Sequence, residues 1–473
     1  MNSKKIIIIL IAILTIKGII WSIAIPLFHG NDEHFHYATI QSYNIPNEYT
    51  GNGNAQEKNR TTFEDIDTHN LSPELKNFLF SSSVDETRFY PENTANFDDF
   101  SQYGEREHET KNASLKNHVL ALPAWKSNQP QLFYRLGSLI EKKLSAFDVG
   151  TRALAIRFLS VSFGVFLSLT AFFIFKEVGL NQKKSLLLSL MVSFQPMLCY
   201  ITSIINIDSL LYFSFSLFIL GSVRFIRNKL NLLTFFIILA GFTISILTKY
   251  TGWIIILFIS ILLFIWIIKY KKIKLVIITP LLIVSSSLIY LIIPKIIKSK
   301  INISGLNIEQ IKAFLFEHFS IYPLIHNSKL YWGFFGNFDT PIHRFILYFI
   351  WFIIGISIIG IIKFLFKLIK NNNNFGEKNI YLVFYFISIV LILHISILLV
   401  DLPFFLEKGR IGICAPGRYF LPLIIAKFYL IFFGLSYLIP KKYHTQLLTT
   451  LLIMMIVLNN YSLFQILIPR FYL

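Results

Sequence analysis

The chain has 473 residues, of which 54% are hydrophobic and only 15% are charged. This composition, with a mean hydropathy of +0.60, excludes a soluble globular protein and indicates a polytopic membrane protein. The formal net charge of +18 does not require a nucleic-acid partner, because Lys and Arg gather on the cytoplasmic side of membrane spans. Two cysteines imply neither a disulfide framework nor a cysteine zinc site.

The first apolar run extends from about Lys5 to Leu27 and is long enough to cross a bilayer. Lys4 and Lys5 precede it and no small-residue cleavage site follows, so we expect a retained helix with a cytoplasmic N-terminus. Lys17 lies near its middle, where a charge costs about 2.5 kcal/mol or more. We expect Lys17 to face a protein or water-filled interior, or to snorkel along its own helix.

Residues 28–150 contain no spanning run and form a large external loop of roughly 120 residues, too long for a simple connector. At its start, Phe35, Ala38 and Ile40 are spaced so that a helix could lie along the membrane surface. Its end, NQPQLFYRLGSLI at 128–140, is an aromatic re-entering segment. The middle shows no strong period, so either an ordered cap or a mobile loop fits it.

Ten further apolar runs follow, which predicts about eleven spans and an all-α fold. The later runs lie at about 153–175, 185–204, 210–225, 232–247, 253–268, 275–293, 345–366, 380–400, 419–439 and 447–467. The chain then divides into helix 1 (1–27), the large loop (28–150), helices 2–7 (151–293), a second external loop (294–344) and helices 8–11 (345–473). Every second connection is basic, which fits the positive-inside rule along the whole chain.

This orientation brings five polar or glycine-rich motifs to the external face, where they can converge into one site. The motifs are NDEHFHY (31–37), NID (206–208), KYTG (249–252), WGFFG (332–336) and GRYFLP (417–422). Clustered carboxylates and imidazoles near a helix end are typical of an active site. In NDEHFHY, the candidate groups are Asp32, Glu33 and His36; the alternative is a solvated helix end with Asp32 as N-cap.

The other motifs supply cations and aromatic rings. Arg418 and Lys249 could bind an anion together, or each could neutralise lipid headgroups. Asp208 could join the site or merely cap the helix that follows it. Trp332 could be a sugar-stacking platform or an aromatic of the interfacial belt. Lys17, His394 and Lys427 are intramembrane ionisable residues to which no motif assigns a role.

The order of these motifs resembles the GT-C superfamily of polytopic glycosyltransferases, and more closely a bacterial family of membrane proteins of unknown function within it. The resemblance extends from Ile6 to about Leu435 and rests on the DE-x-x-H-like motif, QPQLFY, the NID turn, the Lys-Tyr turn, WG-x-FG and GRY-x-x-P. Ile207 stands where the family's Asn-Pro-Asp-like turn has proline, which leaves the geometry of this turn open.

The resemblance implies that the protein moves a sugar from a polyprenyl-phosphate donor to a glycan, lipid or protein acceptor on the outer face of a bacterial plasma membrane. Asp32, with Glu33 second, would be the general base of an inverting transfer. Substrate would be bound by the remaining motif residues, His36, Asn206, Asp208, Lys249, Tyr250, Trp332, Arg418 and Tyr419. Membrane lipids are expected partners and nucleic acid is not.

Cofactor use stays open. Asp32, His36 and Asp208 offer ligands for a divalent cation, whereas many members of the superfamily are thought to work without a metal. Two other functions remain: a transporter or flippase of lipid-linked saccharides, and a non-catalytic envelope assembly protein. Transporters tend to show internal repeats and midplane charges, and the sequence has no repeated halves and groups its polar motifs at one face.

Overall fold

The protein is an all-α polytopic membrane protein, as the sequence predicts. The computed structural model describes residues 3–44, 74–75, 78–79, 130–227, 229, 231–270, 308–336, 339–370, 377–409 and 417–473. Eight helices of this part are long and apolar enough to cross a membrane, and a bent helix pair raises the number to nine. A further apolar helix, Leu232–Thr248, is shorter. The predicted span at 275–293 lies outside the described residues.

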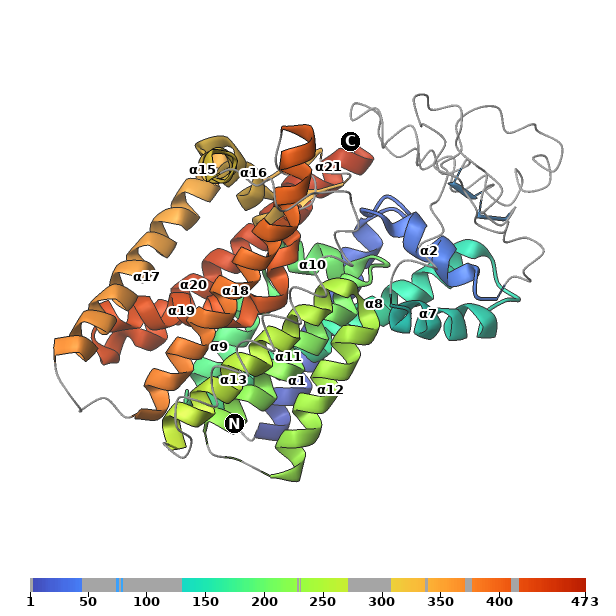
Figure 1. Ribbon diagram of the computed structural model, residues 1–473. Coiled ribbons are helices and arrows are strands. Elements are labelled where there is room, and N and C mark those ends of the chain that lie inside the picture. Colours follow the sequence, from blue (N-terminus) through green and yellow to red (C-terminus); the bar gives the residue numbers. More distant parts are fainter. Residues whose placement is uncertain are drawn as a thin grey trace.

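The helices run mostly along one direction of the bundle (Figure 1). The first half of the chain contains α1 (Ser3–Ala24), α2 (Glu33–Gln41), α7 (Leu132–Lys143), α8 (Val149–Val178), α9 (Gln182–Ser193), α10 (Pro196–Ser203), α11 (Asp208–Ile226), α12 (Leu232–Thr248), η5 (Tyr250–Ile254) and α13 (Ile255–Tyr270). The second half contains α15 (Ile308–His318), α16 (Ile321–Trp332), β1 (Phe334–Phe335), β2 (Thr340–Pro341), α17 (Arg344–Lys370), α18 (Glu377–Lys408), η8 (Gly417–Leu423), α19 (Ile424–Leu438), η9 (Lys441–Tyr443), α20 (His444–Tyr461), η10 (Ser462–Leu467) and α21 (Ile468–Tyr472).

Several helices of the first half begin at residues whose side chains cap them. Asp148, Asn181 and Asn231 each accept a hydrogen bond of 2.9 Å from the amide three residues later, at the starts of α8, α9 and α12. Such a bond satisfies an amide that has no partner within the helix. Helix α8 ends at Gly179, whose φ of 103° suits a residue without a side chain. The capping residues therefore fix where these helices start and stop.

The predicted span at 185–204 is interrupted, since α9 and α10 meet at a bend of 66°. Pro196 occupies the first turn of α10, where the missing amide hydrogen is no loss, and the Gln195 side chain accepts a bond from Leu198 N. At the bend, the Ser193 carbonyl accepts a hydrogen bond from Lys17 Nζ, and Phe194 O accepts one of 3.0 Å from Asn459 Nδ2. Lys17 thus faces the protein interior and satisfies a carbonyl that the break leaves free.

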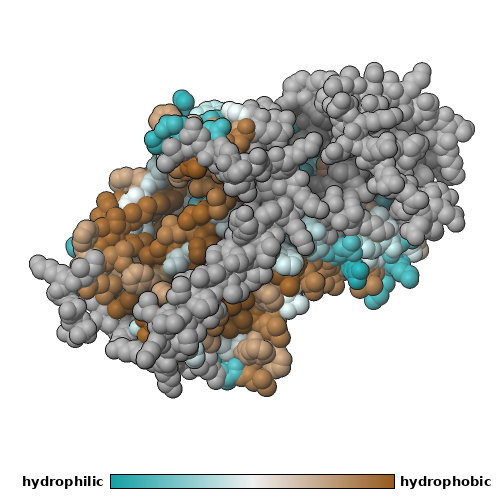
Figure 2. All heavy atoms as spheres, viewed as in Figure 1, coloured by the Kyte–Doolittle hydropathy of each residue, from teal (hydrophilic) through white to brown (hydrophobic). Residues whose placement is uncertain are grey.

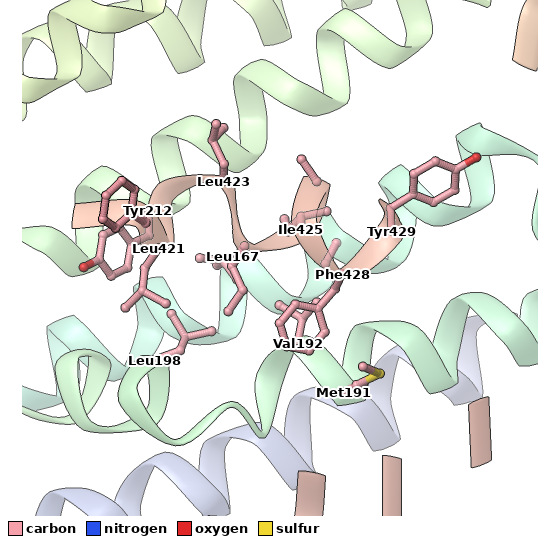
Figure 3. Close-up of a cluster of buried hydrophobic side chains, with 14 of the residues drawn as sticks. Leu167, Met191, Val192, Leu198, Tyr212, Leu421, Leu423, Ile425, Phe428 and Tyr429 are labelled. Carbon is pink, nitrogen blue, oxygen red and sulfur yellow. The ribbon is translucent and has the colours of Figure 1, made fainter. Parts of the chain in front are cut away.

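The core lies where α8, α9 and α10 meet α11, η8 and α19. Figure 3 shows side chains from these elements interleaved: Leu167, Met191, Val192, Leu198, Tyr212, Leu421, Leu423, Ile425, Phe428 and Tyr429. All of them are buried. Apolar side chains also cover much of the described outer surface of the bundle, while hydrophilic residues gather at its ends (Figure 2). An apolar exterior on an apolar core is what a bilayer requires of a helical bundle.

Helix α2 confirms the helix predicted at the start of the large loop, but its environment differs from the expected one. Ala38 and Ile40 are buried, and the helix packs against α7 and against Leu75 and Phe78. Contacts with protein therefore replace the membrane surface along this helix. Most of the middle of the loop lies outside the described residues. The end of the bundle that carries α2, α10 and α21 is the end opposite the N-terminus of α1 (Figure 1).

Candidate active site

Asp32 occupies the turn between α1 and α2 in an unusual conformation. Its φ of 58° and ψ of 11° are left-handed, and Phe28 in the same turn has a φ of 65°. Such conformations cost roughly 1–2 kcal/mol for residues other than glycine and cluster at functional sites. Asp32 takes the N-cap position of α2 but makes no capping hydrogen bond. Its Oδ2 accepts a bond of 2.9 Å from Arg418 Nη2, so the simple N-cap interpretation fails.

Glu33, the neighbouring carboxylate, is held by a different set of groups. Its two oxygens each accept a bond of 2.6 Å from Arg157, and both side chains are essentially inaccessible to solvent. Backbone amides of Phe28, Gly30 and Ile205 also donate to Glu33. The same guanidinium binds the carbonyls at the end of α1, those of Ser22, Ile25 and Pro26. Glu33 therefore ties three chain segments together, and Asp32 is the better placed of the two acids for chemistry.

The NID turn places the second acid of the site. Asn206 is buried and its Oδ1 accepts a bond of 2.8 Å from Asp208 N, so its side chain shapes the turn. Ile207 has a φ of −59°, which is the value that a proline ring enforces. The backbone at Ile207 would therefore accept a proline. Asp208 begins α11 and its Oδ1 accepts a bond of 2.7 Å from Lys249 Nζ.

Lys249 lies between α12 and η5 in an extended backbone conformation, and its side chain reaches the site. Its Nζ also lies 4.7 Å from the centre of the Tyr419 ring, and Arg418 lies 5.6 Å from the centre of the same ring. The Tyr419 ring therefore contributes cation–π attraction to both cations. The joining turn is tight, because a Cβ added at Gly252 would lie 2.2 Å from Ser245 O. Only glycine fits there, and this keeps Lys249 close to Asp208.

Arg418 and Tyr419 lie in η8, directly before α19. The Arg418 backbone carbonyl accepts a bond of 3.0 Å from the Tyr212 hydroxyl, which fixes η8 against α11. Gly417 packs directly on α16, since a Cβ added to it would lie 2.2 Å from Asn327 O. Arg418 is therefore presented to Asp32 by backbone contacts on both sides.

His36 lies among these four charges. Its Nδ1 is 3.0 Å from the hydroxyl of Tyr134, a residue of α7. Burial lowers the pKa of His36 to about 4, and the nearby Lys249 and Arg418 act in the same direction against the attraction of Asp32 and Asp208. The imidazole is therefore neutral near pH 7. Two carboxylates, two cations and a neutral imidazole leave the cluster without net charge.

The carboxylate of Asp32 stays ionised. Burial alone would raise its pKa, but the charge of Arg418 and the hydrogen bond from its guanidinium hold the pKa of Asp32 below its usual range. About a fifth of the Asp32 side chain, 22%, is exposed, compared with 2% for Asp208. Asp32 is thus the more accessible acid of the cluster and can reach a substrate hydroxyl.

The WGFFG stretch packs beside the cluster. Trp332 is 6% exposed and contacts Tyr331 and Phe428, so in this structure its ring belongs to the core and presents no open stacking face. A small antiparallel pair follows, with Phe335 opposite Thr340. Tyr200 joins this hairpin to the acidic turn, since its hydroxyl donates to Gly336 O at 2.9 Å and accepts from Asn31 N at 3.1 Å.

The structure brings together most of the residues that the sequence predicts for the site. Asp32, His36, Asp208, Lys249, Arg418 and Tyr419 form the cluster, and Asn206 shapes one of its turns. Tyr250 lies next to Lys249 with 44% of its surface exposed. Three buried residues were missed: Arg157, Tyr134 and Tyr200. An arginine within an apolar run was a signal that could have identified Arg157.

The donor set does not fit a divalent cation. Among the described residues, no group of three or more His, Cys, Asp or Glu side chains is arranged to hold a metal ion. Asp32 and Asp208, the two acids considered as ligands, each bind a basic side chain instead. The arrangement suits proton transfer at Asp32 beside fixed positive charge that can stabilise an anion.

The comparisons bear on the family and not on the individual site residues. Residues 93–302 match the family model of the dolichyl-phosphate-mannose-protein mannosyltransferases, a GT-C family. The match covers less than half of the chain; it includes Asp208 and Lys249 and excludes Asp32 and Arg418. It confirms the resemblance to GT-C membrane glycosyltransferases. No curated protein matches the chain, and no solved structure does.

Proposed function

We propose that the protein is an inverting glycosyltransferase that moves a hexosyl or pentosyl group from a polyprenyl-phosphate donor to an acceptor on the extracytoplasmic face. The acceptor is a glycan, a lipid or a protein. The single observation that carries the proposal is the 2.9 Å contact between Asp32 and Arg418, beside the 2.7 Å contact between Asp208 and Lys249. An ionised acid and two fixed cations meet in one place, and the chemistry needs both.

In this mechanism, Asp32 accepts the proton of the acceptor hydroxyl as that oxygen attacks the anomeric carbon of the sugar. The bond between this carbon and the phosphate oxygen breaks, and the carrier leaves as a lipid phosphate. Negative charge grows on the leaving oxygen, and the charges of Arg418 and Lys249 stabilise it. Burial makes this stabilisation stronger than it would be in water. Neutral His36 and Tyr134 can position hydroxyl groups without competing for the proton.

The charge pattern of the connections supports the proposed sidedness. Helix α2, which begins at the Asp32 turn, lies at the end of the bundle opposite the N-terminus of α1 (Figure 1). Lys and Arg in alternate connections put that N-terminus in the cytoplasm by the positive-inside rule. The site would then open outward, where a flipped lipid-linked sugar is available.

The test is turnover by purified protein in lipid nanodiscs with polyprenyl-phosphate mannose and its glucose and arabinose counterparts. We expect donor consumption for at least one sugar, and a loss of about 100-fold or more in Asp32→Asn. Asparagine tolerates the left-handed conformation, so the fold should persist. Asp148→Asn is the matched control, because Asp148 only caps α8. Full activity in Asp32→Asn would refute the assignment of the base.

One observation favours a second candidate, a flippase of lipid-linked saccharides. Helices α9 and α10 form a broken span, and transporters often bind substrate at such breaks. In this structure, however, the break is filled by Lys17, Asn459 and Cys199. Movement of a labelled lipid-linked sugar across proteoliposomes without donor consumption would favour this alternative. Donor binding without movement or turnover would favour a non-catalytic assembly protein.

A further inference from the structure

We propose that Lys427 and Tyr331 form a second phosphate-binding site inside the bundle, which takes the phosphate monoester of a lipid. The inference rests on the proposed function for the identity of the lipid, namely the carrier phosphate that the transfer releases. The site is distinct from the Asp32 cluster, since Asp32 contacts Arg418 near the start of η8 whereas Lys427 lies in α19.

Lys427 is a charge within a membrane span. It belongs to the apolar segment Gly417–Leu438, which is long enough to cross a bilayer. A lysine at such depth costs about 2.5–3.5 kcal/mol on insertion scales and usually has a functional partner. Three other buried or partly buried basic residues pair with carboxylates: Arg157 binds Glu33, Arg418 binds Asp32 and Lys249 binds Asp208. Among the described residues, no carboxylate pairs with Lys427.

The surroundings of Lys427 are aromatic. Its Nζ lies 4.4 Å from the centre of the Tyr331 ring and 5.0 Å from the centre of the Phe420 ring. His394 stacks on Phe420 at 4.3 Å, and its Nδ1 is 2.7 Å from Val390 O. These contacts fix the Phe420 ring from its neighbour α18. Cation–π attraction offsets only part of the cost of removing an ammonium group from water.

Tyr331 gives the second and independent observation. Its side chain is buried, with 9% exposed, and within the described structure its hydroxyl has no hydrogen-bond partner. A buried hydroxyl without a partner costs roughly 1–3 kcal/mol, so it usually binds a ligand or water. The ring that carries this hydroxyl is the ring over which Lys427 lies. An ammonium group and a hydroxyl donor, both without an acceptor, are the groups that bind a phosphate oxygen.

The position of the site selects a lipid over a soluble anion. Lys427 is partly exposed, while the helices around it present apolar side chains such as Phe384 and Leu391 of α18 to the bilayer. A free phosphate ion would have to cross this apolar layer, whereas a prenyl chain brings its phosphate through it. Lys427 and Arg418 also belong to one continuous segment, η8 followed by α19. The second site would therefore hold the carrier phosphate on its way between the bilayer and the reaction centre.

The experiment measures binding and needs no turnover, so it is independent of whether the proposed transfer occurs. Farnesyl phosphate is titrated into the protein in nanodiscs, with farnesol and phosphatidylglycerol as separate probes. We expect Lys427→Met to weaken farnesyl phosphate binding about tenfold or more and Tyr331→Phe severalfold, with farnesol unchanged. The Lys427→Arg variant should bind farnesyl phosphate with a Kd within about threefold of the wild-type value, because arginine keeps the charge. Lys441→Met, an exposed lysine, is the control.

The outcomes separate the alternatives. Competition by phosphatidylglycerol as strong as that by farnesyl phosphate would mean an ordinary lipid headgroup site and would overturn the carrier assignment. Equal binding by Lys427→Met and the wild type would overturn the site itself. Methionine removes the charge and keeps the length of the side chain. The melting temperature of the variant without ligand should therefore not fall below that of the wild type. A loss of binding with an unchanged melting temperature therefore supports a site and excludes misfolding.

Discussion

Arg157 binds Glu33 through two bonds of 2.6 Å, although 124 residues separate them in the sequence. Because the same guanidinium also binds three carbonyls at the end of α1, the pair locks the first helix, the acidic turn and α8 into one unit. Glu33, the neighbour of Asp32 in the sequence, thus fixes the position of the turn that carries Asp32.

We expect Glu33→Gln to lower the free energy of unfolding by about 3–5 kcal/mol, because it leaves the buried Arg157 charge without compensation. Thermal unfolding in detergent measures this loss. Glu177→Gln is the control, since Glu177 pairs with Arg224 and Lys229 at a more exposed position. A melting temperature for Glu33→Gln equal to that of the control would contradict the structural role of Glu33.

Asp208 and Lys249 should show the same dependence on each other. Either Asp208→Asn or Lys249→Met alone leaves one buried charge without its partner. We expect each to lower the free energy of unfolding by about 3 kcal/mol or more. The double variant removes both charges and should recover most of this loss. A double-mutant cycle on unfolding checks the coupling, and additive effects would show that the pair does not interact. Activity should be lost in all three variants, because the Lys249 charge is either removed or no longer held in place by Asp208.

Stability should fall between pH 6.5 and 4. Burial, the largest cause, lowers the pKa values of His29 and His36 from 6.5 to about 4 in the folded chain. In this range the unfolded chain binds protons that the folded chain does not, so unfolding becomes easier as the pH falls. By the lower end of this range, each histidine lowers the free energy of unfolding by roughly 3 kcal/mol. Above pH 6.5 this loss is absent. Melting temperatures from pH 7.5 to 4.5 would show it.

A matched pair of variants assigns this pH dependence. His36→Gln should make the profile less steep, because glutamine takes up no proton and only the contribution of His29 remains. His343→Gln changes an exposed residue and should leave the profile as it is. Identical slopes for His36→Gln and the wild type would exclude His36 as a source.

Ile207→Pro should be tolerated. The φ of −59° at this position suits proline, Asn206 before it is not helical, and in the described structure the Ile207 amide donates no hydrogen bond. We expect unfolding free energy to stay unchanged or to rise by about 0.4–1 kcal/mol. Ile205→Pro is the contrast, because Ile205 N donates to Glu33 at 2.9 Å. Equal damage by both substitutions would show that the turn depends on isoleucine itself.

Much of the architecture could be predicted from apolar runs and from the alternation of basic connections. These set the spans and placed Asp32 and Arg418 on one side, which is why their meeting could be expected. The break between α9 and α10 was missed, because an unbroken apolar run gives no sign of a 66° bend other than Gln195 and Pro196.

The roles of neighbouring residues were harder to predict. Asp32 and Glu33 are adjacent carboxylates, and the sequence gives little reason to prefer either. Their difference comes from distant partners, Arg418 for the first and Arg157 for the second. Trp332 could have been an open platform, and only the packing of Phe428 against it decides that the ring is buried. Tertiary contacts of this kind leave no local trace in a sequence.

The contact between Asp32 and Arg418 spans 386 positions of the chain. During synthesis, the acidic turn therefore leaves the ribosome and enters the membrane long before its basic partner exists. Until η8 is inserted, Asp32 has no counter-ion from that segment, and the chain holds an incomplete centre. Under the proposed mechanism, competence for the transfer would arise as one of the last events of biogenesis, so a partly translated chain could not act on a donor prematurely.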